Sequence, residues 1–295
     1  MEVGKLGKLG VWTSLDHLPT PEAAAFANQI EDWGYRALWL PEAVGRDPFS
    51  FIGYLAAQTS QLVFATGIAN IYARDALTMR AVRETLGETS QGRFVLGLGV
   101  SHQPLVTGMR KHVYGKPIET MRGYLEAMGE AVYMGPTPAE PAPVVLAALR
   151  PKMLALSRDA ARGAHPYFVP PEHTARAREI LGKSAWLCPE QMVLLETDAS
   201  KARAIARQNM QIYLGLPNYL NNLKWLGFAE ADLENGGSDR LVDAIVAWGD
   251  EKVIADRIQA HHDAGADHVC IQAFRPDGAQ GFDTRVLETF APARQ

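Results

Sequence analysis

Short apolar runs alternate with helix-like segments along most of the chain, and this alternation limits the possible folds more than any other feature of the sequence. The run at 62–68 is apolar at nearly every position, as is typical of a parallel strand buried on both faces. The pattern predicts eight strands, at 6–12, 37–40, 62–68, 93–98, 144–148, 164–169, 185–196 and 267–273.

The segments between these runs carry the signals of helices. Thr20 is the expected N-cap of the first helix, with Pro21 at its first position. One apolar stripe repeats at steps of three and four residues, as a helix requires; it consists of Ile118, Met121, Leu125, Met128 and Val132. We predict helices over 20–33, 47–59, 77–89, 118–132, 151–162, 171–181, 198–214 and 250–264, with short helices and turns over 217–238.

Strands that alternate with helices pair in parallel through right-handed crossovers, and eight of them can close into a barrel without free edges. A doubly wound open sheet is the alternative. The first strand-to-helix turn lacks the G-x-G-x-x-G loop of a dinucleotide-binding sheet, and Gly97 and Gly99 suit close backbone approach instead. We therefore expect one (β/α)8 barrel domain over residues 1–295.

Composition excludes several classes of function. The formal charge of −4 gives no reason to expect binding to nucleic acid or to an anionic membrane. The first residues lack the apolar core of a secretory signal, and no apolar run is long enough to cross a bilayer, so a cytoplasmic protein is expected. Cys188 and Cys270 each lie in an apolar stretch, as buried cysteines do. The HExxH, CxxC, G-x-S-x-G and Walker motifs are absent, and no metal site is expected.

In a barrel of this kind the active site is built from the loops that follow the carboxyl ends of the strands. Glu42 follows the second strand, where a carboxylate can move a proton or form a loop salt bridge. His102 follows the fourth strand, where an imidazole can exchange a proton near neutral pH or serve a structural role. Both are candidate catalytic residues.

Two further loops are candidates for holding a ligand. Residues 70–74 form a compact polar and aromatic loop that is suited to packing against a planar ring, although such side chains also satisfy their own backbone. Arg150 and Lys152 flank Pro151 at a helix start, where free N–H groups and two cations favour an anion such as phosphate. An ordinary exposed helix start is the alternative.

Taken together, five segments resemble the luciferase-like monooxygenase superfamily, and within it the branch of oxidoreductases that depend on the deazaflavin coenzyme F420. The similarity extends over nearly the whole chain. The segments are LWLPEA (38–43), TGIANIYARD (66–75), GRFVLGLGVSH (92–102), YGKP (114–117) and AGADHV (264–269).

The resemblance implies roles for the candidate residues. It implies a non-prolyl cis peptide at Asn70–Ile71 that supports the central ring of the deazaflavin, and it puts His102 near the reacting carbon. Glu42 falls where relatives carry a catalytic polar residue. The other residues that the resemblance assigns to the cofactor are Tyr72, Gly99 and Ser101, together with Arg150, Lys152 and Met153 at its phosphate. Arg162 departs from the family, which often has Asp at this position.

The function implied by the resemblance is hydride transfer between F420 and a small organic substrate. An FMN-dependent monooxygenase is the first alternative, because FMN and F420 occupy the same face of such barrels. A non-catalytic flavin-binding barrel is the second. By analogy with relatives, a homodimer is expected.

Overall fold

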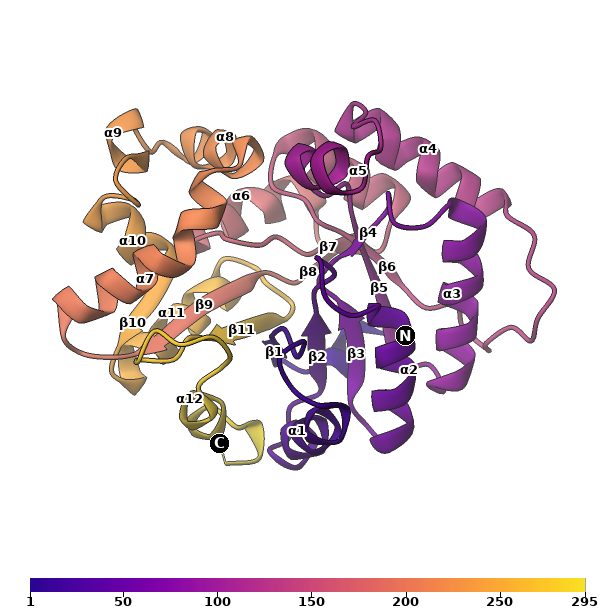
Figure 1. Cartoon of the computed structure of the whole chain (residues 1–295), viewed down its shortest axis with the longest axis horizontal. Coiled ribbons are helices and arrows are strands. Elements are labelled where there is room, and N and C mark those ends of the chain that lie inside the picture. Colours follow the sequence, from indigo (N-terminus) through magenta and orange to yellow (C-terminus); the bar gives the residue numbers. More distant parts are fainter. Residues whose placement is uncertain (295) are drawn as a thin grey trace.

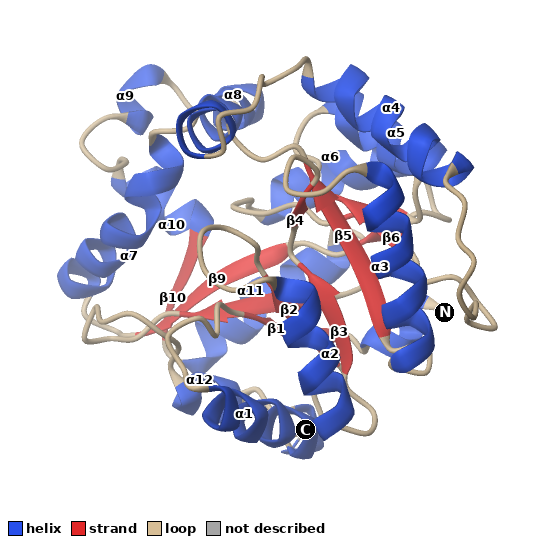
Figure 2. Ribbon diagram, turned by 45° about the vertical axis from the view of Figure 1, so that its right-hand side comes forward, coloured by secondary structure: helices blue, strands red, loops and turns tan. Residues whose placement is uncertain are grey.

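The computed structural model describes residues 1–294, and its parallel strands lie at the centre of the molecule with helices outside them (Figures 1 and 2). The sheet order is β10-β9-β11-β1-β2-β3-β5-β6-β7-β8, with β4 paired to β5. The strands are β1 (Leu9–Trp12), β2 (Ala37–Leu40), β3 (Val63–Thr66), β4 (Ala69–Asn70), β5 (Phe94–Gly99), β6 (Val144–Leu146), β7 (Gly163–Ala164), β8 (Trp186–Leu187), β9 (Glu190–Leu195), β10 (Val246–Gly249) and β11 (Val269–Ala273).

The sheet closes into a barrel because β8 and β9 are two parts of one bent segment. On one side, Trp186 N–H donates to the carbonyl of Arg162 at 2.9 Å, next to β7. On the other side, Asp267 N–H donates to the carbonyl of Leu187 at 2.9 Å, and β9 then pairs with β11. Pro189 lies at the bend. With β8 and β9 counted together, eight strands form the ring, which confirms the predicted (β/α)8 architecture.

The helices follow the predicted segments closely, because apolar stripes and capping residues mark them. Asp47 caps α2 by accepting a hydrogen bond from Ser50 N–H, as the Asp-Pro start predicts. The helices are α1 (Thr20–Asp32), α2 (Pro48–Gln58), α3 (Ala76–Thr89), α4 (Pro117–Glu130), α5 (Pro151–Ala160), α6 (Pro171–Leu181), α7 (Ala199–Leu214), α8 (Pro217–Leu226), α9 (Glu230–Leu233), α10 (Asp239–Ile245), α11 (Glu251–Asp263) and α12 (Thr284–Thr289).

Some expectations were wrong at the level of single elements. Strand β10 and helices α10 and α12 were not predicted, because each is short and its apolar residues show no clear period. Val132 lies beyond the end of α4 and is 73% exposed, so it does not extend the apolar stripe. Thr20 is the first residue of α1 and not its cap, since Pro19 occupies the cap position.

The interior of the barrel is filled by large side chains from several strands. Trp39 stacks on His165 with ring centroids 4.4 Å apart, and its indole N–H donates to His268 Nε2 at 3.1 Å. Gly97 on β5 is required, because a Cβ at this position would lie 1.9 Å from the carbonyl oxygen of Thr66. This confirms close backbone approach at Gly97. The interior is thus a packed core, and ligands are confined to the ends of the barrel.

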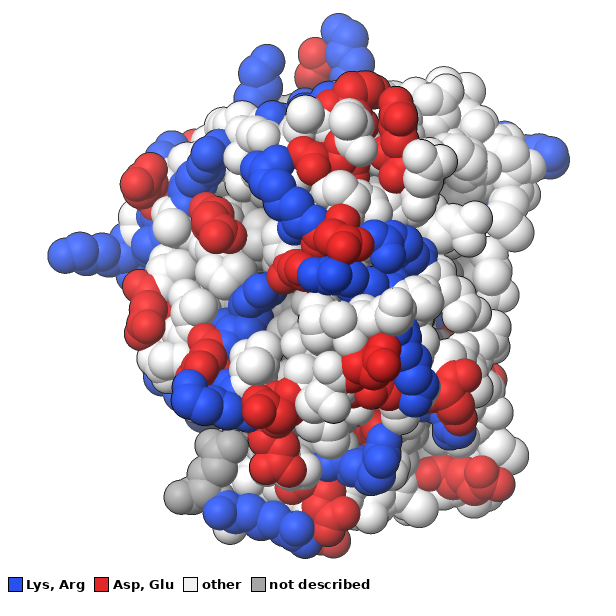
Figure 3. Space-filling model, turned by 90° about the vertical axis from the view of Figure 1, so that its left-hand side faces the viewer, with Lys and Arg blue, Asp and Glu red and all other residues white. Residues whose placement is uncertain are grey.

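The outer surface carries mixed charge where α7 and α10 lie. Basic and acidic side chains alternate on this face (Figure 3). Arg203 bonds both Asp239 and Asp243 at 2.7 and 2.6 Å, and Arg207 bonds Asp239 at 2.5 Å. Within residues 1–294, no helix has both the length and the apolar character to cross a membrane.

Candidate active site

The candidate residues meet at the carboxyl end of the barrel because parallel strands all end on the same side. Strand β2 leads to Glu42, β4 ends at Asn70, and β5 leads to Ser101 and His102. The loop after β6 reaches Arg150 at the start of α5. The predicted site residues therefore share one end of the barrel.

Glu42 is anchored on both carboxylate oxygens. Its Oε2 accepts a hydrogen bond from Asn70 N–H at 2.8 Å, and its Oε1 accepts one from Arg74 Nη1 at 2.7 Å. Only 6% of the side chain is exposed. This is the loop salt bridge that the sequence left as the alternative, and it holds the 70–74 loop against the end of β2.

The 70–74 loop and the end of β5 are joined by backbone and side-chain hydrogen bonds. Asn70 Oδ1 accepts from Tyr72 N–H at 2.9 Å, and Ile71 N–H donates to the carbonyl of Gly99 at 3.1 Å. Asn70 is buried, and its Nδ2 has no hydrogen-bond partner among residues 1–294. Ser101 follows with a φ of 56°. The structure therefore brings Asn70, Ile71, Tyr72, Gly99 and Ser101 together.

Tyr72 extends this contact to the long loop after β5. Its hydroxyl accepts a hydrogen bond from Gly115 N–H at 2.9 Å, and its ring stacks on Tyr114 at 5.8 Å. Tyr114 in turn donates to the carbonyl of Ser101 at 3.2 Å. The loop is thereby tied to both strand ends.

The expected position of the cis peptide was wrong. The non-prolyl cis bond lies between Gly67 and Ile68, just before β4, and Asn70–Ile71 is trans. The sequence did not indicate the interruption between β3 and β4, because Gly67 and Ile68 continue the apolar run at 62–68. The Ile68 side chain lies over Gly99, where a Cβ would approach Ile68 Cδ1 to 2.4 Å. Gly99 thus contacts Ile68 closely.

His102 lies close to α8, which begins the segment 217–238 that was expected to form short helices and turns. Its ring centroid is 5.6 Å from that of Tyr219 on α8, and Asn218 hydrogen-bonds its side chain. Burial lowers the pKa of His102, opposed by the Asn218 hydrogen bond. The imidazole is therefore mainly neutral at pH 7, and it can accept a proton.

A cluster of tyrosines beside His102 was missed by the sequence analysis. The hydroxyls of Tyr167 and Tyr213 are 2.6 Å apart, and Tyr167 also donates to Gln272 Oε1 at 2.8 Å. The rings of Tyr213 and Tyr219 are 5.3 Å apart. These side chains come from the loop after β7, from α7 and from α8, so no single motif could reveal them.

Glu190 is a buried carboxyl group close to this tyrosine cluster, and it too was missed. It is 1% exposed, and its Oε2 accepts a hydrogen bond from Phe168 N–H at 3.3 Å. Its Oε1 has no partner in the part of the chain described. Burial raises the pKa of Glu190 to about 8, so the group is largely protonated at pH 7. An acidic residue next to Pro189 inside an apolar strand was the available signal.

The start of α5 has the features expected of an anion site. Arg150 occupies the cap position without a side-chain cap, and Pro151 follows at the first helical position. Arg150 and Lys152 are exposed, and neither pairs with a carboxylate among residues 1–294. Met153 is buried behind them. The helix N-terminus thus offers two free cations at the barrel mouth.

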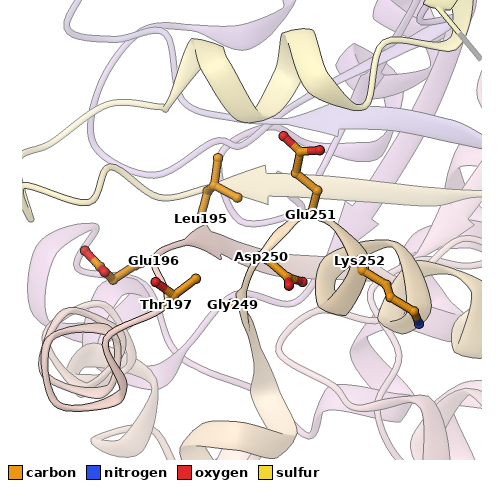
Figure 4. Close-up of a pocket in the computed structure, with 7 residues that line it drawn as sticks. All are labelled: Leu195, Glu196, Thr197, Gly249, Asp250, Glu251 and Lys252. Atoms are coloured by element: carbon orange, nitrogen blue, oxygen red, sulfur yellow. The ribbon is translucent and has the colours of Figure 1, made fainter.

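Two cavities adjoin this end of the molecule. One, of about 370 Å³, is lined by Glu42, Ala43, Val44, Gly45, Arg46, Asp47, Arg74, Leu105, Met109 and Arg110. The other, of about 500 Å³, lies where β9 and β10 end (Figure 4). In the second, the side chains of Glu251 and Lys252 point apart, and Glu196 is held by Lys201 at 2.5 Å. Polar groups converge better in the first cavity.

Comparison with known proteins identifies curated relatives. A Mycobacterium tuberculosis protein named as a coenzyme F420-dependent oxidoreductase is 30% identical over 128 residues, which is 43% of this chain and 36% of that protein. The 5,10-methylenetetrahydromethanopterin reductase of Methanolobus tindarius is 26% identical over 220 residues, which is 64% of this chain and 66% of the reductase. The matched part thus spans less than two thirds of either relative.

Solved structures share the fold over greater lengths. An F420-dependent secondary alcohol dehydrogenase in complex with an F420–acetone adduct superposes with a TM-score of 0.71 at 12% identity, covering 90% of this chain and 92% of that one. The oxygenating constituent of 3,6-diketocamphane monooxygenase from Pseudomonas putida, in complex with FMN, gives 0.69 at 13% identity and 97% of both chains.

The family itself follows from the sequence match. The model of the family described as luciferase-like monooxygenase matches residues 6–268, which include every strand of the barrel up to the start of β11. The homologues and structural neighbours are oxidoreductases and monooxygenases. The chain therefore belongs to the luciferase-like monooxygenase family.

Proposed function

We propose that this protein is an enzyme that transfers a hydride between coenzyme F420 and a small organic substrate at the carboxyl end of the barrel. The observation that carries the proposal is the start of α5, where Arg150 and Lys152 lie unpaired at a helix N-terminus without a side-chain cap. A phosphate group is the natural ligand of such a position. The relatives named for F420 support the deazaflavin over other phosphate-bearing cofactors.

The residues at the mouth fit a flavin-type group in two further respects. Asn70 Nδ2 is a buried donor without a partner among residues 1–294, so it can bind a polar edge of a ring. Ile68 and Ala147 are partly exposed apolar side chains beside Gly99 and can pack against a ring face. In this proposal Asn70, Ile71, Tyr72, Gly99 and Ser101 hold the ring.

When bound, the deazaflavin would supply the carbon that gives or accepts the hydride. The protein's part is binding, exclusion of water and proton transfer. His102 is the proposed proton-handling residue, because its neutral imidazole can take a proton from a substrate hydroxyl and return it. Glu42 holds the 70–74 loop, and we now propose it as a positioning residue, since both its oxygens are engaged.

An FMN-dependent monooxygenase is the second candidate function. The structure with bound FMN superposes about as well as the structure with the F420 adduct, and both cofactors carry phosphate. The start of α5 therefore fits either. A non-catalytic flavin-binding barrel is the third possibility, in which a cofactor binds without turnover.

Titration of the purified protein with F420 and with FMN tests the proposal directly. Quenching of cofactor fluorescence should reveal tighter binding of F420 than of FMN. The R150A/K152A variant should bind F420 at least about tenfold more weakly, because each charge-assisted bond to phosphate contributes about 1.5–3 kcal/mol. A K5A/K183A control removes two exposed cations elsewhere and should bind normally.

The outcomes separate the candidates. Tight binding of FMN without binding of F420 would favour the monooxygenase. Binding of either cofactor with no turnover of any alcohol, aldehyde or imine would favour the non-catalytic barrel. Unchanged F420 affinity in R150A/K152A would remove the start of α5 from the cofactor site.

A further inference from the structure

The 370 Å³ cavity, which we call the Arg110 cavity, lies beside the proposed ring site. Its floor includes Glu42 and Arg74, the pair that anchors the 70–74 loop. Its other walls are the segment 43–47 after β2 and the π-helix Pro104–Met109 after β5. Both walls follow strands that end at the barrel mouth, so a molecule in this cavity lies next to the cofactor site.

The charges that line the Arg110 cavity are unequal. Three arginines face two carboxylates, those of Glu42 and Asp47. Arg74 already bonds both of these carboxylates. The Arg74 guanidinium also lies 4.5 Å from the ring centre of Phe49, so its contacts are made within the protein. Arg74 is thus the shared ion-pair partner of both carboxylates, and three arginines against two carboxylates leave the lining with a formal charge of +1.

Arg110 and Arg46 remain without a carboxylate partner within residues 1–294. The Arg110 guanidinium donates no hydrogen bond to any residue in this range, and its Nε is buried. Arg46 donates to the carbonyl of Leu18 at 2.5 Å and lies over Phe51, but its Nη1 is unpartnered. The nearby Asp16 accepts from the backbone N–H of Arg46 at 3.2 Å and does not line the cavity. A partly buried guanidinium without an acceptor favours a ligand that supplies one.

The remaining wall is apolar. Val44 is 68% exposed and Met109 is 64% exposed, although both are large hydrophobic residues, and Leu105, which also lines the cavity, is partly buried. Exposed apolar side chains around a cavity are typical of a surface that a ligand covers. An unpaired cation beside this wall matches a molecule with one anionic end and an apolar body.

We propose that the Arg110 cavity binds the substrate and that the substrate is a small aliphatic carboxylate with a hydroxyl or carbonyl group on its chain, the group that gives or accepts the hydride. Arg110 holds its carboxylate, and Val44, Leu105 and Met109 contact its chain. The planar fork of a guanidinium matches a carboxylate through two parallel hydrogen bonds. The identification of this ligand as the substrate rests on the proposed function. The binding of a carboxylate does not, because the cavity is formed by protein residues alone.

Calorimetric titration of the cofactor-free protein with hexanoate, 1-hexanol and inorganic phosphate tests the proposal. Hexanoate should bind, and 1-hexanol and phosphate should each bind at least about tenfold more weakly, because one lacks the charge and the other the apolar body. R110Q should weaken hexanoate binding by about tenfold or more. M109S should weaken it less, and K116Q, a nearby exposed residue outside the cavity, should leave it unchanged.

Equal binding of hexanoate and 1-hexanol, equal binding of phosphate, or full hexanoate affinity in R110Q would each overturn the proposal. A second titration with the protein saturated with F420 separates substrate from cofactor. Hexanoate should still bind; its exclusion by F420 would mean that the cavity holds an anionic group of the cofactor. If F420 does not bind while hexanoate binds through Arg110, the proposed function fails and the carboxylate site stands.

Discussion

Replacement of Glu190 by glutamine should stabilise the protein at alkaline pH. The glutamine has nearly the same shape and keeps an oxygen for Phe168 N–H, but it cannot ionise. The pKa of Glu190 is raised by burial from 4.5 to about 8. Because the unfolded chain releases this proton at lower pH than the folded protein does, native Glu190 lowers stability progressively as pH rises from about 4.5 to about 8.

The size of the effect follows from the two pKa values. One pKa unit corresponds to about 1.4 kcal/mol, so the raised pKa of Glu190 lowers the free energy of unfolding by about 2 kcal/mol at pH 6 and by roughly 5 kcal/mol at pH 8.5. The stability gained by E190Q should therefore grow by about 2 to 3 kcal/mol between these pH values. The groups that face Glu190 do not titrate in this range, since burial raises the pKa of Tyr167, Tyr213, Tyr219 and Cys270 as well.

Urea unfolding followed by tryptophan fluorescence at pH 6, 7.5 and 8.5 provides the measurement. The quantity to compare is the difference in unfolding free energy between E190Q and the parent protein at each pH, so that all other titrating groups cancel. E179Q, at an exposed position, is the matched control and should give a difference that does not change with pH. A difference for E190Q that is equally constant would refute the reasoning.

Three further predictions concern buried or partly buried groups. Burial lowers the pKa values of four histidines to about 3 or 4, and they are His165, His173, His261 and His268. The stability that these neutral side chains provide is complete above about pH 6.5 and is lost as pH falls toward 4. The unfolding free energy should fall by up to about 5 kcal/mol per pH unit in this interval, and a flat profile between pH 6.5 and 5 in urea unfolding would contradict this. H102A should keep F420 affinity and lose turnover in steady-state kinetics, and normal turnover would remove His102 from proton transfer. E42Q should lower the thermal midpoint measured by calorimetry, because it leaves Arg74 without a full partner.

The sequence was sufficient for the barrel because its elements are short, regular and locally determined. The limits of β2 and α6 were predicted to the residue, since the apolar run at Ala37–Leu40 and the proline at Pro171 leave little freedom. The bend at Pro189 was not predicted, because periodicity cannot tell one bent strand from one straight strand. The cis bond at Gly67–Ile68 was missed for a similar reason, as an apolar pair inside an apolar run gives no signal.

The candidate site was predictable only where strand ends define it. Asn70, Gly99 and Ser101 directly end or follow strands, and the structure brings them together as expected. Tyr213 and Tyr219 reach the same place from helices far along the chain, and only the packing of those helices brings them there. The Arg110 cavity depends on a π-helix whose sequence, PLVTGM, carries no strong helix signal.

Strand β9 pairs with a different strand on each of its two edges. One edge bonds β11 and completes the ring, and the other edge bonds β10, which joins the segment with α8–α10 to the outside of the barrel. The segment that carries Tyr219 is thus attached to the ring through β10, and the strand pairs that close the ring do not include it. Its sequence can change, and with it the surroundings of His102, while the eight-stranded ring keeps its backbone pairing intact. The segment is coupled to the ring through side-chain packing instead, because its buried Leu241 and Val242 share a core cluster with Met192 and Leu194 of β9.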